Sequence, residues 1–103
     1  MNDWVSLEKQ YYMQVARRQP IVLVRGDGVE VWDENNKRYL DFTAGWAVNN
    51  VGHCNPYVIK AVANQAATLM QTSNQFYSIP QIQLSQLLID NSCLDRAFIC
   101  NSG

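Results

Sequence analysis

The stretch IVLVRGDGVEVWDENNKRYLDF, residues 21–42, decides the fold expected for this chain. Apolar and polar side chains alternate along much of it, and its two breaks are rich in glycine, aspartate and asparagine, which is typical of short strands joined by tight turns. The predicted strands are residues 21–24, 29–32 and 38–42, with turns at 26–28 and 33–36. The stretch therefore predicts three short antiparallel strands linked by tight turns. Gly26 and Gly28 do not indicate a phosphate-binding loop, because a strand rather than a helix follows them.

Helices are predicted on both sides of this sheet, at residues 3–18, 56–71 and 79–90. Asp3 can cap the first helix, and Asn55 followed by Pro56 is a typical start for the second. Ser78 with Gln81 matches the capping-box pattern at the start of the third. Apolar residues at helical spacing then favour one buried face on each helix.

The segment Thr43–Cys54 fits neither the helical nor the strand period. Its sequence, TAGWAVNNVGHC, is apolar for a loop, so we expect it to be buried against another part of the fold. Trp46 within it is either an anchor of the core or a wall of a binding site.

The last residues carry a weak ligand-binding pattern. Ala97–Cys100 is a short apolar run that predicts a buried strand, and Asn101, Ser102 and Gly103 follow it. In a parallel α/β fold, such a corner between a strand and a helix offers backbone N–H groups and a hydroxyl to a phosphate. A simple turn after an edge strand explains the same residues without a ligand.

Composition excludes several classes of protein. The chain has 103 residues, of which 48% are hydrophobic and 17% charged, so it has enough apolar material for a core and is not a disordered chain. A net charge of -1 gives no signal for nucleic acid or an anionic membrane. No apolar run is long enough to cross a bilayer, and the amino end lacks signal-peptide features. Three cysteines without a Cys-x-x-Cys pair, and a single histidine, favour buried free thiols in a reducing cytoplasm over a zinc site or disulfides.

Three groups of motifs resemble a known family when taken in order. They are Val24–Asp33 with Lys37–Phe42, then Gly45–Pro56, and finally Phe98–Gly103. Together they look like the N-terminal part of a class III, pyridoxal-phosphate-dependent aminotransferase, with the closest likeness to acetylornithine and ornithine aminotransferases. The resemblance covers essentially all of the chain, and the order and spacing of the motifs make it specific.

This resemblance implies an α/β protein, the N-terminal fragment of a fold type I transferase. That fragment would contain an N-terminal helix, a small antiparallel sheet, further helices and the first strand of the large-domain sheet. The implied parts are residues 1–52 in the small domain, 53–78 as a connecting helix and link, and 79–103 at the start of the cofactor-binding large domain. It also implies a homodimer, pyridoxal 5'-phosphate as cofactor, and amino-acid and oxo-acid substrates.

The resemblance places part of a site, but no catalytic residue, on this chain. Ser102 and Gly103 match the start of the phosphate-binding turn. Trp46 matches an aromatic position that contacts substrate in the ornithine enzymes, and Tyr77 matches another aromatic near the substrate channel, so both are expected to be substrate-binding residues. For both aromatics, packing in a core is the alternative. Phe76 is an alternative to Tyr77, and Asn74 is a further candidate near the cofactor of a partner subunit, with a helix-linking turn as the alternative. His53 is expected to be a structural hydrogen-bonding residue rather than a general base.

The catalytic lysine of the family lies beyond residue 103, so Lys9, Lys37 and Lys60 are expected to be solvated surface residues. Transfer of an ω-amino group from an acetylornithine-like or ornithine-like substrate to an oxo-acid is the expected activity of the parent enzyme, and the fragment alone is expected to be inactive. Two alternatives stay open: another class III enzyme that uses 4-aminobutyrate or a diamine, and a free-standing α+β interaction module.

Overall fold

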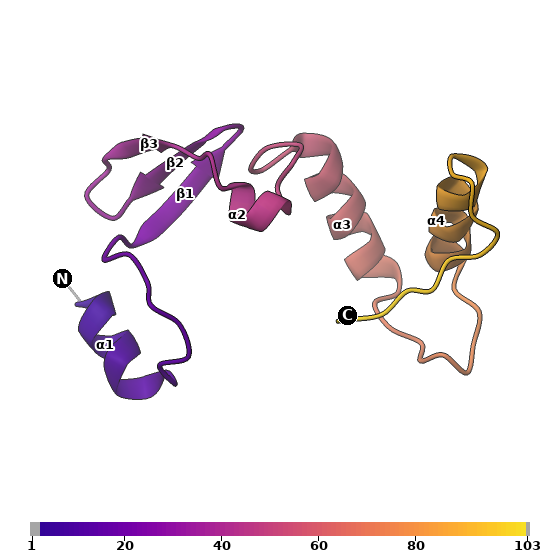
Figure 1. The fold of residues 1–103 in the computed structure, drawn as a ribbon, viewed down its shortest axis with the longest axis horizontal. Coiled ribbons are helices and arrows are strands. Elements are labelled where there is room, and N and C mark those ends of the chain that lie inside the picture. Colours follow the sequence, from indigo (N-terminus) through magenta and orange to yellow (C-terminus); the bar gives the residue numbers. More distant parts are fainter. Residues whose placement is uncertain (1–2, 103) are drawn as a thin grey trace. The chain divides into compact units, whose positions relative to one another are not determined.

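A computed structural model describes residues 3–102 of the chain. The chain divides into two compact units, Met1–Ala63 and Asn64–Gly103. The elements, shown in Figure 1, are α1 (Trp4–Tyr11), β1 (Leu23–Asp27), β2 (Glu30–Asp33), β3 (Arg38–Leu40), α2 (Ala44–Ala47), α3 (Pro56–Thr68) and α4 (Ile79–Asp90). Their order follows the prediction except at two places: α2 is an addition, and the strand predicted after α4 is absent from the described residues.

The predicted three-stranded sheet is confirmed as an antiparallel sheet of order β1-β2-β3. The predicted position of the first turn, residues 26–28, was wrong. β1 starts later than predicted and continues to Asp27, which pairs with Glu30, so the connection is the two-residue turn Gly28–Val29. Gly28 has a φ of 54°, a left-handed conformation that glycine adopts without strain.

The most buried residues of the first unit lie on β2 itself. Val31 is only 6% exposed, and Asp33 at the end of the same strand is 8% exposed. The carboxylate of Asp33 accepts hydrogen bonds from the backbone N–H groups of Asn35 and Lys37, both at 2.9 Å, and from the Tyr39 hydroxyl at 2.8 Å. These bonds, with the Lys37 N–H as the largest cause, lower the pKa of Asp33. The carboxylate therefore closes the turn between β2 and β3.

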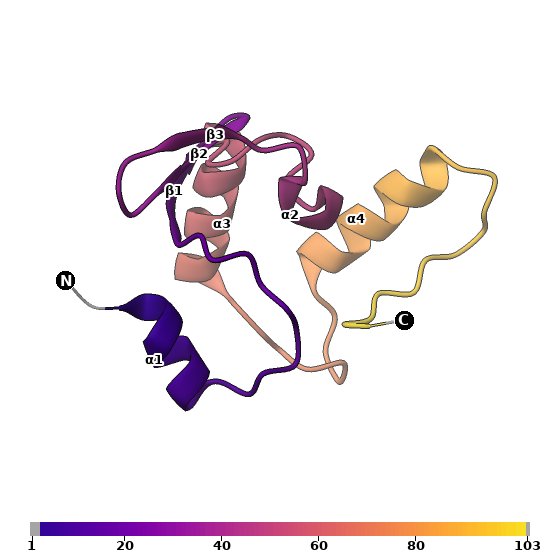
Figure 2. The same cartoon turned by 60° about the vertical axis from the view of Figure 1, so that its left-hand side comes forward.

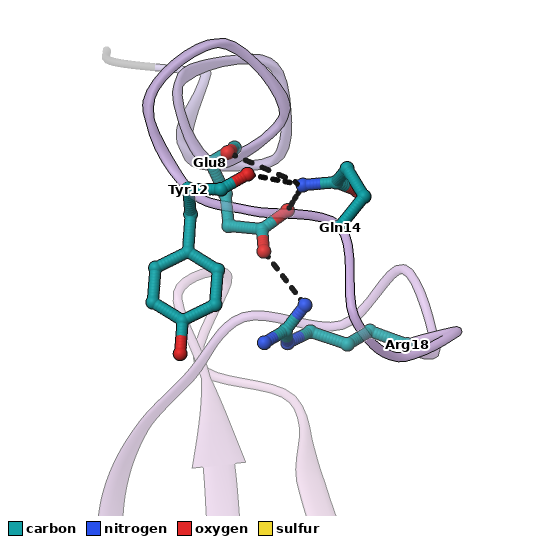
Figure 3. Close-up of polar contacts among 4 residues, drawn as sticks. All are labelled: Glu8, Tyr12, Gln14 and Arg18. Atoms are coloured by element: carbon teal, nitrogen blue, oxygen red, sulfur yellow. Dashed lines mark hydrogen bonds and ion pairs between the residues drawn. The ribbon is translucent and has the colours of Figure 1, made fainter.

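Helix α1 is shorter than predicted. Asp3 caps it as expected, since its carboxylate accepts from the backbone N–H of Ser6 at 3.1 Å, but the helix ends at Tyr11 instead of Arg18. The chain then folds back, and the Glu8 carboxylate binds Gln14 Nε2 at 3.0 Å and Arg18 at 2.7 Å (Figure 3). A continuous helix brings together residues three or four apart, so these longer-range contacts compete with the predicted extension.

Helix α3 starts as predicted. Asn55 Oδ1 accepts a hydrogen bond from the backbone N–H of Tyr57 at 3.0 Å, and the helix ends at Thr68, three residues before the predicted Gln71. The start of α4 is also confirmed, but its predicted capping mechanism was wrong. Ser78 occupies the N-cap position and its side chain makes no capping hydrogen bond.

The predicted strand at Ala97–Cys100 does not form within residues 3–102. This segment has no strand assignment, and Phe98 is 90% exposed. A β-strand requires a hydrogen-bonded neighbour, and no described segment pairs with this one. Instead, the segment after α4 turns back beside that helix, as Figure 2 shows, and residues 97–99 line a hollow with α4 residues. Among the described residues, no helix is both long enough and apolar enough to cross a membrane.

Candidate functional site

Asp41, just after β3, holds the segment that carries Trp46. One carboxylate oxygen accepts hydrogen bonds from the backbone N–H and the hydroxyl of Thr43, at 2.9 and 2.8 Å, and from the backbone N–H of Ala44 at 3.0 Å. The other oxygen lies 2.6 Å from His53 Nε2. The contact with His53, followed by those with Thr43 and Ala44, holds the pKa of Asp41 far below its usual range. Asp41 therefore joins the two ends of the segment 43–53.

The hairpin tip binds the far end of this segment. The backbone N–H of His53 donates to the carbonyl of Gly28 at 2.7 Å, and the N–H of Gly28 donates to the carbonyl of His53 at 3.0 Å. A Cβ atom on Gly26 would lie 2.7 Å from His53 Cγ, and one on Gly52 would lie 3.1 Å from the Gly28 backbone. The two glycines therefore permit this close approach.

Trp46 lies on a strained turn rather than in an irregular loop. The four residues of α2 all have left-handed backbone angles, with φ of 47° at Ala44, 59° at Gly45, 62° at Trp46 and 64° at Ala47. The N–H of Ala47 donates to the carbonyl of Thr43 at 3.1 Å, which closes the turn. The Trp46 side chain is 96% exposed, so in the described structure it does not anchor a core.

In the second unit, Tyr77 lines an open hollow of about 390 Å³ beside α4. The other lining residues are Asn74, Phe76, Ser78, Gln81, Ile82, Ser85, Ala97, Phe98 and Ile99. Tyr77 is 96% exposed and Phe76 69%, so both aromatic side chains are available for contact with another molecule or chain segment. Asn74 also lines a neighbouring hollow of about 370 Å³. The structure thus brings the candidates Asn74, Phe76 and Tyr77 together.

Ser102 is not among the residues that line the Tyr77 hollow. Its hydroxyl is exposed and donates weakly to Asn101 Oδ1 at 3.5 Å, while Gly103 lies outside the described residues. A serine hydroxyl and an asparagine amide are donors that suit a phosphate, so the donor set at this end fits the phosphate of pyridoxal phosphate.

The lysines and cysteines that the sequence analysis considered are all exposed. Lys9, Lys37 and Lys60 are exposed, as predicted. Cys54, Cys93 and Cys100 are free and exposed, which differs from the buried thiols expected. Residues 3–102 contain no cluster of three or more His, Cys, Asp or Glu side chains that could hold a metal ion.

Asp41 is the residue that sequence reasoning missed. His53 was expected to form structural hydrogen bonds, but no carboxylate near it in the sequence pointed to a partner, because Asp41 is twelve residues away. One local signal was present. An aspartate followed two residues later by threonine is typical of a side chain that accepts from the backbone ahead of it.

The fold of this chain is similar to that of solved aminotransferases. The ornithine aminotransferase PY00104 from Plasmodium yoelii superposes with a TM-score of 0.87 at 35% sequence identity, covering 91% of this chain and 25% of that one. The acetylornithine aminotransferase from Elizabethkingia anophelis gives a TM-score of 0.85 at 32% identity, covering 90% of this chain and 24% of the other. The predicted fold class, an N-terminal fragment of this transferase fold, is therefore confirmed.

Sequence comparison gives the family. The model of the class-III aminotransferases matches residues 11–103, so the chain belongs to the class-III aminotransferase family. The acetylornithine aminotransferase of Methanocaldococcus jannaschii is 56% identical over 101 residues, which cover 98% of this chain and 25% of the relative. The acetylornithine aminotransferase of Caldanaerobacter subterraneus subsp. tengcongensis is 43% identical over 99 residues, 96% of this chain and 25% of that protein. The chain thus spans about a quarter of the length of the relatives it matches.

Proposed function

We propose that this chain is the N-terminal part of an aminotransferase that moves the ω-amino group of acetylornithine or an ornithine-like substrate to an oxo-acid such as 2-oxoglutarate. The observation that carries this proposal is the 56% identity to an acetylornithine aminotransferase over 98% of the chain. The family match over residues 11–103 favours this function over a free-standing interaction module. The chain alone is proposed to be inactive, because Lys9, Lys37 and Lys60 are exposed and none of them lines the hollow that contains Tyr77.

Pyridoxal 5'-phosphate is the proposed cofactor, and it would supply the electron sink for amino-group transfer. Ser102 is proposed to donate its hydroxyl to the phosphate, with the backbone of Gly103 beside it. Trp46 and Tyr77 are proposed to form walls against the substrate, since both rings are almost fully exposed on the segments that present them. Neither ring carries a charge, so their proposed roles are to orient the substrate chain and to exclude water.

The proposed division is residues 1–52 in the small domain, 53–78 as the connection and 79–103 in the large domain. A cytoplasmic homodimer is proposed for the complete enzyme. Exposed apolar side chains on α3 and α4, among them Val62 and Leu87 at 62% each, support burial against further protein. The three free cysteines are compatible with a reducing compartment.

A second candidate is another class III ω-aminotransferase with a different amino donor. The solved taurine:2-oxoglutarate aminotransferase from Bifidobacterium kashiwanohense supports this alternative, because it superposes on 82% of this chain with a TM-score of 0.74 at 30% identity. The same local fold therefore occurs in an enzyme whose donor is not ornithine-like.

A chimera tests the proposed function. In it, this chain replaces the matching quarter of the Methanocaldococcus jannaschii relative, and transfer to 2-oxoglutarate is measured with acetylornithine, ornithine, 4-aminobutyrate and taurine. We expect acetylornithine to be the preferred donor. A folded chimera that binds the cofactor and prefers 4-aminobutyrate or taurine would favour the second candidate, and one without any transfer would contradict both. Replacing Trp46 by Ala in the chimera should raise the KM for the preferred donor.

A further inference from the structure

We propose that Asp41 is a positioning residue for substrate recognition: it holds the left-handed turn Ala44–Ala47 in the conformation that presents Trp46 to the substrate. The inference rests on the proposed function, because it takes Trp46 to be a substrate wall. It adds a residue that touches neither substrate nor cofactor and acts through the backbone of the turn.

The backbone of the turn requires such a support. Ala44, Trp46 and Ala47 all have φ between 47° and 64°, where the Cβ atom of an L-residue crowds the carbonyl oxygen that follows it. Only Gly45 of the four adopts this conformation freely. Three such residues within four positions persist only where surrounding contacts determine them, and strained backbone of this kind clusters at functional sites.

Asp41 supplies those contacts at the start of the turn. Its Oδ1 atom accepts from the N–H of Ala44, the first left-handed residue, and from both donors of Thr43. The carbonyl of Thr43 in turn accepts from the N–H of Ala47 across the turn. The carboxylate thus fixes the residue that closes the turn around Trp46.

Asp41 is itself fixed to the sheet. Its backbone N–H donates to the carbonyl of Val29 at 2.9 Å, and its Oδ2 atom lies 2.6 Å from His53 Nε2. His53 pairs with Gly28 at the hairpin tip. Asp41 is therefore attached to the hairpin at two points, directly at Val29 and through His53 at Gly28. Because the Trp46 side chain is 96% exposed, little packing constrains it, and the backbone of the turn is what sets its direction.

The chain offers a matched control in Asp33. Its carboxylate also accepts from two backbone N–H groups and one side-chain hydroxyl, and it also closes a turn at the end of a strand. The turn that Asp33 closes, between β2 and β3, does not contain Trp46. Replacing Asp33 therefore removes the same kinds of hydrogen bond from a turn, but it should not change how the protein recognises substrate.

The kinetic experiment uses the chimera described above with acetylornithine as donor. We expect Asp41→Ala to raise the KM on the order of tenfold to a hundredfold with a much smaller change in kcat, as for loss of positioning. Asp33→Ala should leave the KM unchanged. In a double-mutant cycle, Asp41→Ala should add nothing to the KM of Trp46→Ala, because both changes remove the same contact.

Milder variants keep the test valid if Asp41→Ala fails to fold. Asp41→Asn retains one oxygen acceptor and should show a smaller rise in KM than Asp41→Ala. Thr43→Ala removes the hydroxyl donor and should also raise the KM, whereas Thr43→Ser restores that donor and should return the KM to that of the unaltered chimera. Equal effects of Thr43→Ala and Thr43→Ser would contradict the hydrogen-bonding route.

A spectroscopic experiment separates this inference from the proposed function. With 5-fluorotryptophan placed at position 46 in the chimera, the unaltered protein and Asp33→Ala should give the same single fluorine resonance. Asp41→Ala should shift or broaden it. An unchanged resonance and KM in Asp41→Ala would overturn the positioning role, even where Trp46→Ala still raises the KM. A changed resonance with no effect of Trp46→Ala on KM would instead support the positioning role and overturn the proposed substrate contact.

Discussion

Replacing Gly26 by Ala should open the contact between the hairpin and His53. The added Cβ atom would lie 2.7 Å from His53 Cγ, 2.8 Å from its Cβ and 3.0 Å from its Nδ1. Separations below 3.0 Å require movement, and His53 cannot move freely because its ring contacts Asp41 and its backbone pairs with Gly28. The backbone angle at Gly26 is not left-handed, so the whole cost comes from crowding.

Overpacking of this kind costs about 1–3 kcal/mol. If the strain is relieved by separating His53 from Gly28, their mutual hydrogen bonds should open about 5- to 150-fold more often. The assay is amide hydrogen exchange of Gly28 and His53 in the chimera, which also contains the rest of the relative's chain. The amide of Asp33, which donates to the Lys37 carbonyl at 3.0 Å in the next turn, is the internal reference.

A comparison with Gly28 tests the reasoning. A Cβ atom at Gly28 would meet nothing within 4 Å, but its φ of 54° disfavours alanine by about 1–2 kcal/mol. Asparagine tolerates this conformation better, so Gly28→Asn should cost less than Gly28→Ala. At position 26 the order should reverse, because asparagine adds more atoms to a crowded space. Rescue by asparagine at 26, or unchanged exchange in Gly26→Ala, would refute the steric explanation.

Three further predictions concern the Asp41 carboxylate, the three lysines and the exposed apolar side chains. First, the pKa of Asp41 is depressed in the folded chain, so its hydrogen bonds should stabilise the segment 43–53 above about pH 4, the ordinary aspartate value, and be lost as pH falls through the lowered pKa. Carbon-13 titration of its carboxylate should show a midpoint well below 4, and an ordinary midpoint would contradict the observed contacts. Second, the 103-residue chain mixed with pyridoxal phosphate and reduced with borohydride should show no stoichiometric adduct at a single lysine, since Lys9, Lys37 and Lys60 are all exposed. Mass spectrometry that located one such adduct would contradict the surface assignment. Third, the isolated chain should associate as its concentration rises, because side chains such as Val58, Val62 and Leu87 are 49–62% exposed. Sedimentation should detect this, and a cooperatively melting monomer would count against it.

The fold was largely predictable because its elements depend on local signals. Alternation and turn residues in 21–42 predicted the sheet, and the pairs Asn55–Pro56 and Ser78–Gln81 predicted where α3 and α4 begin. Element ends were less predictable. Helix α1 ends early because Glu8 binds Gln14 and Arg18 from a returning segment, a contact that helical periodicity does not contain. The prediction of a strand at Ala97–Cys100 was wrong because it also depended on a contact that the local sequence does not contain. A strand requires a hydrogen-bonded partner, and apolar character alone does not supply one.

The turn that carries Trp46 illustrates why a site is harder to predict than a fold. Propensity assigns Ala44, Trp46 and Ala47 to right-handed or extended backbone, and a single glycine among them does not indicate four left-handed residues in a row. What determines the turn is a carboxylate that accepts three hydrogen bonds at its start, together with a histidine twelve residues away that fixes the same carboxylate. The backbone of that histidine pairs with Gly28, and its ring fits beside Gly26 because glycine has no side chain. The conformation of the turn therefore depends jointly on the hairpin, Asp41 and His53. Because these contacts support a strained segment, we expect small changes at Gly26 or Gly28 to alter the position of the exposed Trp46 ring.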